Sequence, residues 1–266
     1  MFDGFNRKID YLRVSVTDRC NLRCTYCMPE EGIKLLDHAD ILTFGEITAF
    51  IREAVDGGIT KVRITGGEPL VRRNIAALVG MISEIGGIRD LSMTTNGILL
   101  GEFAHDLKQA GLQRVNISLD TIDPIQYRKI TRGGNVSDVL KGIEAARRAG
   151  LTPVKINCVV KMSRDEEDAR GVADFCKRND LEIRYIRQMD LCRGFFSVVD
   201  GGTGGNCKIC NRLRLTAQGM LKPCLFSHLE FSIRELGHRQ ALALAVKNKP
   251  ESGKTNNNGC FYNIGG

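Results

Sequence analysis

The chain has 266 residues, of which 42% are hydrophobic and 26% are charged, a balance typical of a globular protein with a buried core. Its apolar runs are too short to span a membrane and its N-terminus lacks a signal-peptide pattern, so we expect a cytoplasmic protein with no membrane contact. The formal charge of +7 favours an anionic ligand, but the absence of tryptophan argues against stacking on single-stranded nucleic acid.

Strand and helix patterns alternate along the first 190 residues. Strands are predicted at six places: 11–16, 61–65, 91–95, 114–119, 153–160 and 182–187. Helices are predicted between them: 44–55 (capped by Thr43), 74–85, 102–110, 136–149 and 165–178. Such alternation favours a parallel sheet, open or closed into a partial barrel, with its chemistry at the C-terminal ends of the strands.

The pattern changes after residue 190. Residues 194–206 hold five glycines and no clear period, so we expect a mobile connection. A hairpin around the Gln218-Gly219 turn, a helix over 230–246 (at least from residue 238) and a loose polar stretch at 251–258 are predicted beyond it. The chain is therefore divided into three parts: a barrel (1–190), a glycine-rich connection (191–205) and a C-terminal extension with a tail (206–266).

The first chemical motif is a cysteine loop that directly follows the first predicted strand. Cys20, Cys24 and Cys27 have the spacing C-x3-C-x2-C. Three thiolates on one short loop can bind three irons of a [4Fe-4S] cluster and leave the fourth iron open, which is a feature of catalytic sites. A disulfide loop or a zinc site is the alternative, but zinc usually recruits a fourth ligand close by, and His38 is eleven residues past Cys27.

A second cysteine set occurs in the predicted hairpin. Cys207, Cys210 and Cys224 have the spacing C-x2-C-x13-C. A zinc hairpin is one interpretation, and a second [4Fe-4S] cluster with an open iron that binds a substrate nitrogen or oxygen is the other. The remaining four cysteines are expected to be unliganded: Cys158, Cys176, Cys192 and Cys260.

Basic residues follow a two-residue period on several predicted strands. Lys61 and Arg63 alternate with apolar residues, so both point to one face of their strand. Charges that face a barrel interior require anionic partners, and guanidinium groups bind phosphate in a two-pronged way. A solvated edge or internal salt bridges would be the plainer explanation of this pattern.

The cysteine loop and the segment Gly66-Gly67-Glu68-Pro69 together resemble the radical S-adenosylmethionine (SAM) superfamily. The resemblance implies that the open iron is chelated by SAM, and that reduction of the cluster cleaves SAM to a 5'-deoxyadenosyl radical. It implies SAM contacts at four positions: Tyr26, Gly67, Ser118 and Met189. Without the resemblance, the glycine segment would be a plain strand-to-helix turn, Ser118 a strand-end hydroxyl and Met189 a packing residue.

Both cysteine sets, the segment Asn211–Thr216 and the terminal Gly265-Gly266 are similar to the GTP 3',8-cyclase family of molybdenum cofactor biosynthesis. This narrower resemblance implies a partial parallel (β/α)6 radical SAM barrel with a C-terminal iron-sulfur extension and two [4Fe-4S] clusters. The deoxyadenosyl radical would remove the ribose 3'-hydrogen of GTP, and the carbon radical would attack guanine C8 to give 3',8-cyclo-7,8-dihydro-GTP. An electron donor, a downstream molybdopterin-pathway enzyme and a homodimer are further expectations.

The same resemblance implies the substrate contacts. They are Arg13, Arg63, Thr94, Lys155, Arg212 and Arg214, with Arg184 as a weaker candidate. Arg212 and Arg214 would also act in catalysis, because they position the substrate and assist reduction of the aminyl radical. The terminal Gly265-Gly266 would reach the active site as a flexible tail, or be an ordinary loose C-terminus.

One departure from the family pattern bears on the substrate. The family has several tens of additional residues between the sixth strand and the second cysteine set, where this chain has only residues 191–205. A radical SAM peptide-modifying enzyme with an auxiliary electron-transfer cluster is therefore the alternative function, although a peptide does not need the basic residues. A pure electron carrier is a third hypothesis, but it would have no use for the Gly66–Pro69 segment.

Overall fold

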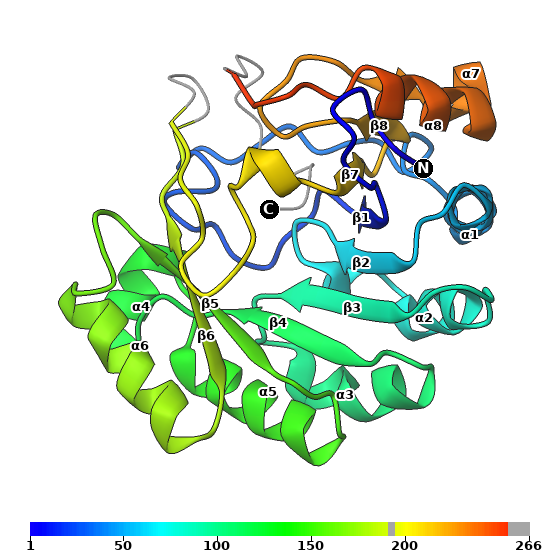
Figure 1. Cartoon of the computed structure of the whole chain (residues 1–266). Helices are drawn as coiled ribbons and strands as arrows, with labels where there is room; N and C mark the ends of the chain where they lie inside the picture. Colours follow the sequence, from blue (N-terminus) through cyan, green and yellow to red (C-terminus); the bar gives the residue numbers. More distant parts are fainter. Residues whose placement is uncertain (191–194, 255–266) are drawn as a thin grey trace.

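The computed structural model describes residues 1–190 and 195–254, and one nine-stranded sheet forms its frame (Figure 1). The strands are β1 Tyr11–Ser15, β2 Lys61–Thr65, β3 Asp90–Thr95, β4 Arg114–Ser118, β5 Lys155–Val160, β6 Glu182–Arg187, β7 Arg212–Leu215, β8 Met220–Lys222 and β9 Phe231–Ser232. Their spatial order is β6-β5-β4-β3-β2-β1-β7-β8-β9. Because β6 and β9 lie at the two ends of this order, the described sheet is open, and the predicted partial parallel barrel is confirmed.

The parallel part of the sheet extends beyond the six predicted strands. β7 pairs in parallel with β1, and only β8 and β9 are antiparallel to their neighbours. The predicted hairpin is therefore confirmed as β7–β8, but it continues the barrel sheet on the β1 side. Its apolar residues share the core of the barrel, since Leu213 and Leu221 belong to the same buried cluster as Leu12 and Ile64.

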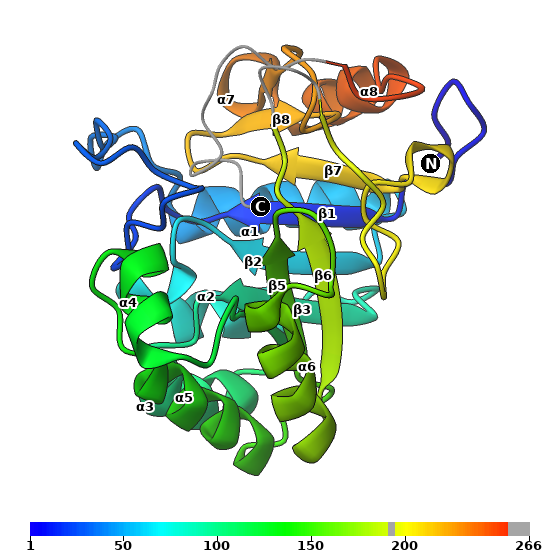
Figure 2. The same cartoon turned by 90° about the vertical axis from the view of Figure 1, so that its left-hand side faces the viewer.

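Helices lie around the outside of the curved sheet (Figure 1 and Figure 2). They are α1 Phe44–Asp56, α2 Ile75–Ser83, α3 Leu100–Gln109, α4 Pro124–Thr131, α5 Val136–Arg148, α6 Glu167–Arg178, α7 Ile233–Leu236 and α8 His238–Lys247. Two 3-10 turns complete the set: η1 Pro69–Val71 and η2 Cys207–Ile209. No helix in the described part of the chain is long and apolar enough to cross a membrane.

The helix α4 was not predicted from the sequence. Asp123 caps its start, where Oδ1 accepts from the N–H of Gln126 at 2.7 Å, and Pro124 occupies the first turn. Only Tyr127 and Thr131 of this helix are buried, so its apolar period is too weak to mark it.

One further prediction for the C-terminal part was wrong and another was right only in part. Residues 195–205 were expected to be a mobile connection, but Tyr185 on β6 and Asp200 exchange main-chain hydrogen bonds of 3.0 and 3.1 Å, which fix this segment against the sheet. The helix expected at least from residue 238 is confirmed as α8, but the stretch before it is a separate short helix, α7, because Gly237 has a φ of +75° that ends α7 before α8 begins. The other part of the connection, residues 191–194, lies outside the described residues.

Candidate active site

Both cysteine sets line one cavity of about 550 Å³. The first set, at Cys20–Cys27, follows the C-terminal end of β1. Cys210 instead precedes β7, whose first residue, Arg212, is in register with the first residue of β1. The two cysteine sets therefore lie toward opposite ends of the parallel strands, with the inner face of the sheet between them.

The Gly66–Pro69 segment holds the first cysteine loop through its backbone. The N–H of Gly67 donates to the carbonyl of Thr17 at 2.7 Å, and the N–H of Glu68 donates to that of Arg19 at 2.8 Å. A side chain at position 67 would place its Cβ 2.4 Å from the Arg19 oxygen, so only glycine permits this approach. The segment is thus more than a strand-to-helix turn, because its fit against the loop depends on glycine.

The buried Glu68 carboxylate joins this segment to the end of β3. It accepts from the hydroxyl of Thr95 and from the N–H of Asn96, each at 2.7 Å. Burial raises the pKa of Glu68 to about 7, although these hydrogen bonds act in the opposite direction. The side chain of Asn96 in turn donates to Asn21, beside Cys20, at 2.7 Å.

The first loop fits an iron-sulfur cluster better than it fits a single metal ion. The described cysteines are all free thiols, so they form no disulfide among themselves. No three His, Cys, Asp or Glu side chains in the described ranges converge closely enough to bind one ion. Zinc needs every sulfur about 2.3 Å from one centre, whereas a cluster binds each thiolate through a different iron. Three separate thiols that all face one cavity satisfy the second requirement.

The residues predicted to contact SAM lie on the cavity wall: Tyr26, Gly67, Ser118 and Met189. Tyr26 is held in place by its hydroxyl, which donates to Asp120 Oδ2 at 2.7 Å. The other carboxylate oxygen of Asp120 accepts from the N–H of Val159 at 2.8 Å. Burial raises the pKa of Tyr26, and the Asp120 charge adds to this effect.

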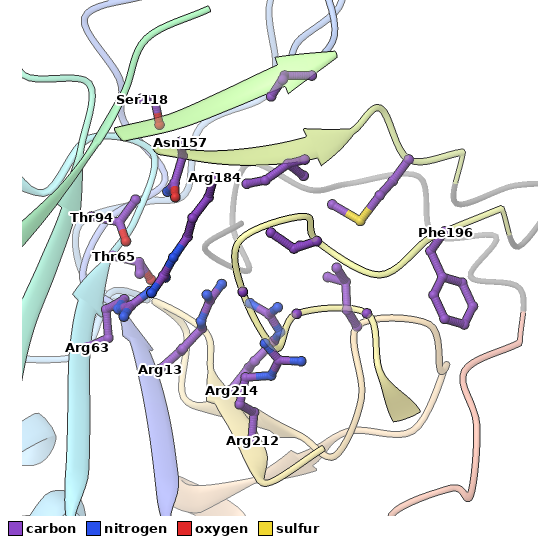
Figure 3. Close-up of a pocket in the computed structure, with 18 of the residues that line it drawn as sticks. Arg13, Arg63, Thr65, Thr94, Ser118, Asn157, Arg184, Phe196, Arg212 and Arg214 are labelled. Atoms are coloured by element: carbon purple, nitrogen blue, oxygen red, sulfur yellow. The ribbon is translucent and has the colours of Figure 1, made fainter. Parts of the chain in front are cut away.

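Three arginines form a row on the inner face of the sheet (Figure 3). Arg13 on β1 is in register with Arg63 on β2 on one side and with Arg214 on β7 on the other. Adjacent like charges on neighbouring strands repel each other, so this row favours an anionic ligand. Burial is the main cause that lowers the pKa of Arg63 to about 10, and the charge of Arg13 acts in the same direction.

Tyr11, which sequence reasoning missed, lies on β1 two residues before Arg13, next to this row on the side of the N-terminal ends of the strands. It is in register with Lys61 and Arg212, and the guanidinium groups of Arg13 and Arg63 lie 5.8 and 5.4 Å from its ring centroid. Tyr11 and Arg13 are two residues apart on one strand, so the period noted for Lys61 and Arg63 would also have placed Tyr11 on the inner face.

Two polar atoms on the cavity wall are buried without a partner among the described residues. They are Thr94 Oγ1 and Arg184 Nε, and both side chains point toward the arginine row (Figure 3). An unsatisfied buried polar atom costs about 1–3 kcal/mol, which a ligand can recover. Thr94 and Arg184 were both predicted as substrate contacts.

Other predicted residues differ in their placement. Arg212 and Arg214 line the cavity beside the second cysteine set, and the guanidinium of Arg212 reaches Cys210 Sγ at 3.9 Å. Lys155 does not line the cavity, and its ammonium is ion-paired with Glu182. Cys192, Cys260 and the terminal Gly265-Gly266 lie outside the described residues.

Comparisons with known proteins place the chain in a family. The family model for the radical SAM superfamily matches residues 14–176. A GTP 3',8-cyclase of Thermodesulfovibrio yellowstonii is 43% identical over 89% of this chain and 88% of that protein. One of Alkaliphilus oremlandii is 41% identical over 94% of this chain and 93% of that protein. The chain belongs to the radical SAM superfamily and, within it, to the GTP 3',8-cyclase family.

Solved structures support the fold alone, because their sequence identity is low. SuiB of Streptococcus suis bound to S-adenosylmethionine has a TM-score of 0.68 at 16% identity, over 91% of this chain. This chain spans only 64% of the length of SuiB. The anSMEcpe protein with bound AdoMet has a TM-score of 0.63 at 16% identity, over 90% of this chain and 78% of that one.

Family membership makes this chain an enzyme and implies a [4Fe-4S] cluster and SAM as its cofactors. The alignment with the Thermodesulfovibrio protein runs over 282 positions, more than the 266 residues of this chain. The relative therefore has residues that this chain lacks, as the short connection led us to expect.

Proposed function

We propose that this enzyme catalyses the GTP 3',8-cyclase reaction of molybdenum cofactor biosynthesis with two [4Fe-4S] clusters. The observation that carries the proposal is a single cavity with three cysteines toward each end and a row of arginines between them. An electron carrier needs no such row, and a peptide substrate needs no concentration of guanidinium groups.

The first loop would hold the cluster that the family shares. Cys20, Cys24 and Cys27 are its ligands, and when bound it supplies the electron that cleaves SAM to a deoxyadenosyl radical. The chain's own contribution is orientation. Tyr26 presents its ring from the loop while Asp120 fixes its hydroxyl, and Gly67 lines the same cavity.

The second set, Cys207, Cys210 and Cys224, would hold the second cluster and anchor the guanine base. All three line the cavity, and no fourth Cys, His, Asp or Glu in the described ranges completes a compact zinc site with them. Arg212, which reaches Cys210 Sγ, lies between this group and the arginine row. It would position the base, and with Arg214 it would assist reduction of the substrate radical.

The arginine row would bind the triphosphate. Arg13, Arg63 and Arg214 present adjacent guanidinium groups at one level of the sheet, and phosphate oxygens accept two-pronged hydrogen bonds from such groups. Thr94 and Arg184 would complete the contact through atoms that have no described partner. Lys155 could join it only by leaving Glu182. The electron donor, the downstream enzyme and the homodimer stay predictions.

Two measurements test the proposal. Anaerobic reconstitution should yield about eight irons per chain, as two [4Fe-4S] clusters require, and zinc at the second site would contradict it. Incubation with SAM, a reductant and GTP should form 5'-deoxyadenosine in step with GTP loss and a cyclised nucleotide. Deoxyadenosine formed equally without GTP, and no new nucleotide, would instead favour the peptide-modifying alternative.

A further inference from the structure

Two buried cations that are not among the predicted site residues contact the backbone of the second cysteine set. Arg7 precedes β1 and is 7% exposed, and Lys249 follows α8 and is 3% exposed. They come from the two ends of the described chain, more than 200 residues apart in sequence. A buried charge is costly unless a specific partner compensates it, so each cation needs a reason for its position.

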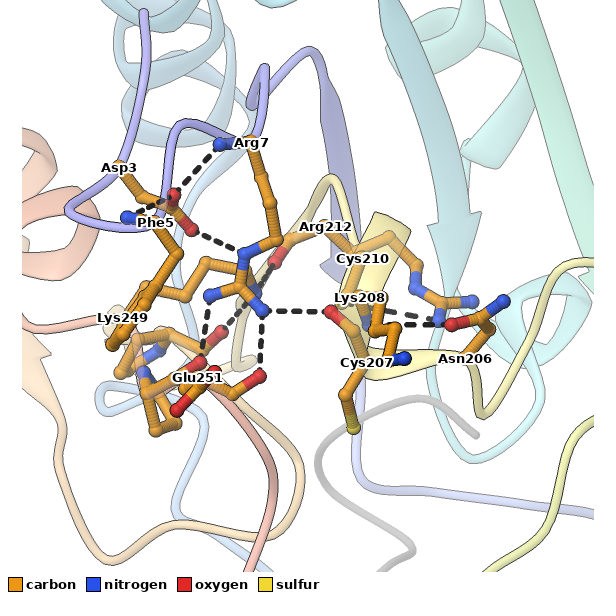
Figure 4. Close-up of polar contacts among 12 residues, drawn as sticks. Asp3, Phe5, Arg7, Asn206, Cys207, Lys208, Cys210, Arg212, Lys249 and Glu251 are labelled. Carbon is orange, nitrogen blue, oxygen red and sulfur yellow. Dashed lines mark hydrogen bonds and ion pairs between the residues drawn. The ribbon is translucent and has the colours of Figure 1, made fainter.

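Arg7 joins three segments of the chain (Figure 4). Its Nη1 donates to the carbonyl of Cys207 at 2.7 Å and to that of Glu251 at 2.8 Å, and its Nη2 donates to that of Pro250 at 2.7 Å. Asp3 orients the guanidinium, because its Oδ2 accepts from Arg7 Nε at 2.7 Å. A guanidinium carries several donors in a rigid fork, which suits a residue that binds three carbonyls at once.

The Asp3–Arg7 pair is ordered by the N-terminal segment itself. Asp3 Oδ1 accepts from the N–H groups of Phe5 at 3.0 Å and Arg7 at 2.9 Å, and the Asp3 side chain is 0% exposed. The guanidinium also lies over the Phe5 ring, 5.2 Å from its centroid. The orientation of the Arg7 guanidinium is therefore set within residues 3–7, independently of the cysteine stretch that it contacts.

Lys249 holds the other two cysteine-bearing stretches. Its Nζ donates to the carbonyls of Arg212 and Pro223, each at 2.7 Å, and these residues lie two positions after Cys210 and one before Cys224. Its ammonium has no carboxylate partner among the described residues, and the two stretches that it joins carry Cys210 and Cys224. A buried ammonium in this position is favoured by an anionic group on the cysteines.

We propose that Arg7, oriented by Asp3, and Lys249 are positioning residues for an anionic iron-sulfur group held by Cys207, Cys210 and Cys224. Arg7 fixes the first stretch of the site, and Lys249 fixes the other two and supplies a counter-charge. The inference rests on the proposed function, which assigns the second cluster. A [4Fe-4S] group on three thiolates is an anion whose stability and reduction potential depend on nearby charge and hydrogen bonds.

The first cysteine loop provides a matched control. The Nη1 of Arg132, after α4, donates to the carbonyls of Arg23 and Met28 at 3.0 and 2.9 Å, so it binds that loop as Arg7 binds the second set. Lys222 is the control for Lys249, because it is also a buried lysine, 2% exposed, but its ammonium pairs with Glu230 at 2.9 Å.

The first experiment isolates the second cluster in the full chain with the substitutions Cys20→Ala, Cys24→Ala and Cys27→Ala. After reconstitution, adding Arg7→Ala should speed iron release to a chelator about 10- to 100-fold, the range found for outer contacts of metal sites. Adding Arg132→Ala should leave the rate unchanged. In the opposite background, the second cysteine set is replaced by alanine and only the first cluster is bound. There Arg132→Ala should speed iron release, and Arg7→Ala should leave the rate unchanged.

The second experiment measures charge rather than attachment. In the background with only the second cluster, Lys249→Met should lower the reduction potential, because removal of a positive charge disfavours the more negative reduced cluster. Lys249→Arg should restore most of the potential, and Lys222→Met should leave it unchanged. Thermal unfolding of each variant without iron checks that the fold persists. If Arg7→Ala does not fold, Asp3→Asn and Arg7→Lys are used in its place.

The outcomes separate the two proposals. Equal iron release from the Arg7→Ala and Arg132→Ala variants, together with an unchanged potential in Lys249→Met, would overturn the roles proposed for Arg7 and Lys249. The proposed two-cluster enzyme would not be affected by that result. Iron bound only at the first loop of the wild-type chain would overturn the two-cluster function and, with it, this inference.

Discussion

The two cysteine sites lie toward opposite ends of one cavity and are held by different interactions. The first is a contiguous loop whose main chain pairs with the end of α4, where the N–H of Thr25 donates to the carbonyl of Ile130 at 2.9 Å. The second is assembled from separate stretches, and buried cations at Arg7 and Lys249 tie their carbonyls together. The first site therefore combines main-chain pairing with one side chain, Arg132, whereas the second depends on side chains that reach it from both ends of the described chain.

The two sites also differ in charge. Burial, the neighbouring Cys27 and the Asp120 carboxylate raise the pKa of Cys24 to about 12. Burial opposes ionisation of Cys210 as well, but the charges of Lys249 and Arg212 lower its pKa to about 7. SAM carries a net positive charge and a nucleoside triphosphate a negative one. The cations therefore lie along the arginine row and toward the second cysteine set, where the proposed reaction would place GTP, and not at the first loop, where it would place SAM.

The largest expected effect comes from removing one ligand at each site. Cys24→Ala should reduce deoxyadenosine formation by more than the roughly 100-fold typical of changes to outer contacts, because it removes a ligand itself. Cys210→Ala should still form deoxyadenosine but no cyclised nucleotide. Chromatography of both products checks this, with the buried Cys176→Ala in α6 as control. Equal loss of deoxyadenosine in the two variants would show that the sites do not have separate roles.

The next effect tests the arginine row between the two cysteine sites. Arg63→Met should raise the KM for GTP about 10- to 100-fold, since a hydrogen bond to a charged group is worth about 1.5–3 kcal/mol. The same change should raise the Tm of the ligand-free enzyme, because it relieves repulsion in the arginine row. Steady-state kinetics and thermal unfolding measure the two, and the exposed Arg148→Met is the control. A lower Tm without ligand would contradict the assignment of the row as strained by its own charge.

A smaller effect tests the contact between Asp120 and Tyr26 at the first cysteine loop. Asp120→Asn keeps an acceptor for the Tyr26 hydroxyl but removes the charge, and Tyr26→Phe removes the hydrogen bond and keeps the ring. Each should weaken SAM binding by about tenfold, the scale of one hydrogen bond to a charged group, without changing the KM for GTP. Equilibrium binding of SAM is the measurement. A parallel rise in the KM for GTP would mean that the SAM contacts and the GTP contacts are not independent.

The smallest effect concerns the ion pair that links α7, in the C-terminal extension, to α1, in the barrel. Arg234 on α7 donates to Glu46 on α1 at 2.8 Å, and Glu46 also forms the capping box with Thr43. The hydrogen bond from Arg234 is the main cause that lowers the pKa of Glu46 to about 2, so this stabilisation is complete above pH 4.5 and is lost as the pH falls toward 2.

Glu46→Gln should therefore flatten the acid side of the stability profile. Glutamine keeps the capping box but loses the charge that pairs with Arg234, and a surface ion pair is worth about 0.2–1 kcal/mol, which corresponds to a Tm decrease of at most about 2–4 °C in a chain of this size at neutral pH. Thermal unfolding between pH 2 and pH 7 measures both, with Arg239→Met, whose partner is Glu53, as control. An unchanged profile would show that the Arg234 link does not contribute.

Sequence reasoning could assign the family and propose the first cysteine site because their signals are local. The spacing of Cys20, Cys24 and Cys27 lies within eight residues, and the Gly66–Pro69 segment is continuous. The partial barrel followed from the alternation of strands and helices. The helix α4 was missed because it buries only Tyr127 and Thr131, although its end supports the cysteine loop.

The amino-acid sequence by itself determined which residues could bind metal and which strands carry alternating charge, since spacing and period require no knowledge of neighbours. Only the tertiary structure decided that β7 adds to β1, which brings Arg63, Arg13 and Arg214 into one row. It also decided that Arg7 and Lys249 meet at the second cysteine set. Pairing between distant segments leaves no local pattern, because sheet order and the burial of single cations depend on the whole fold.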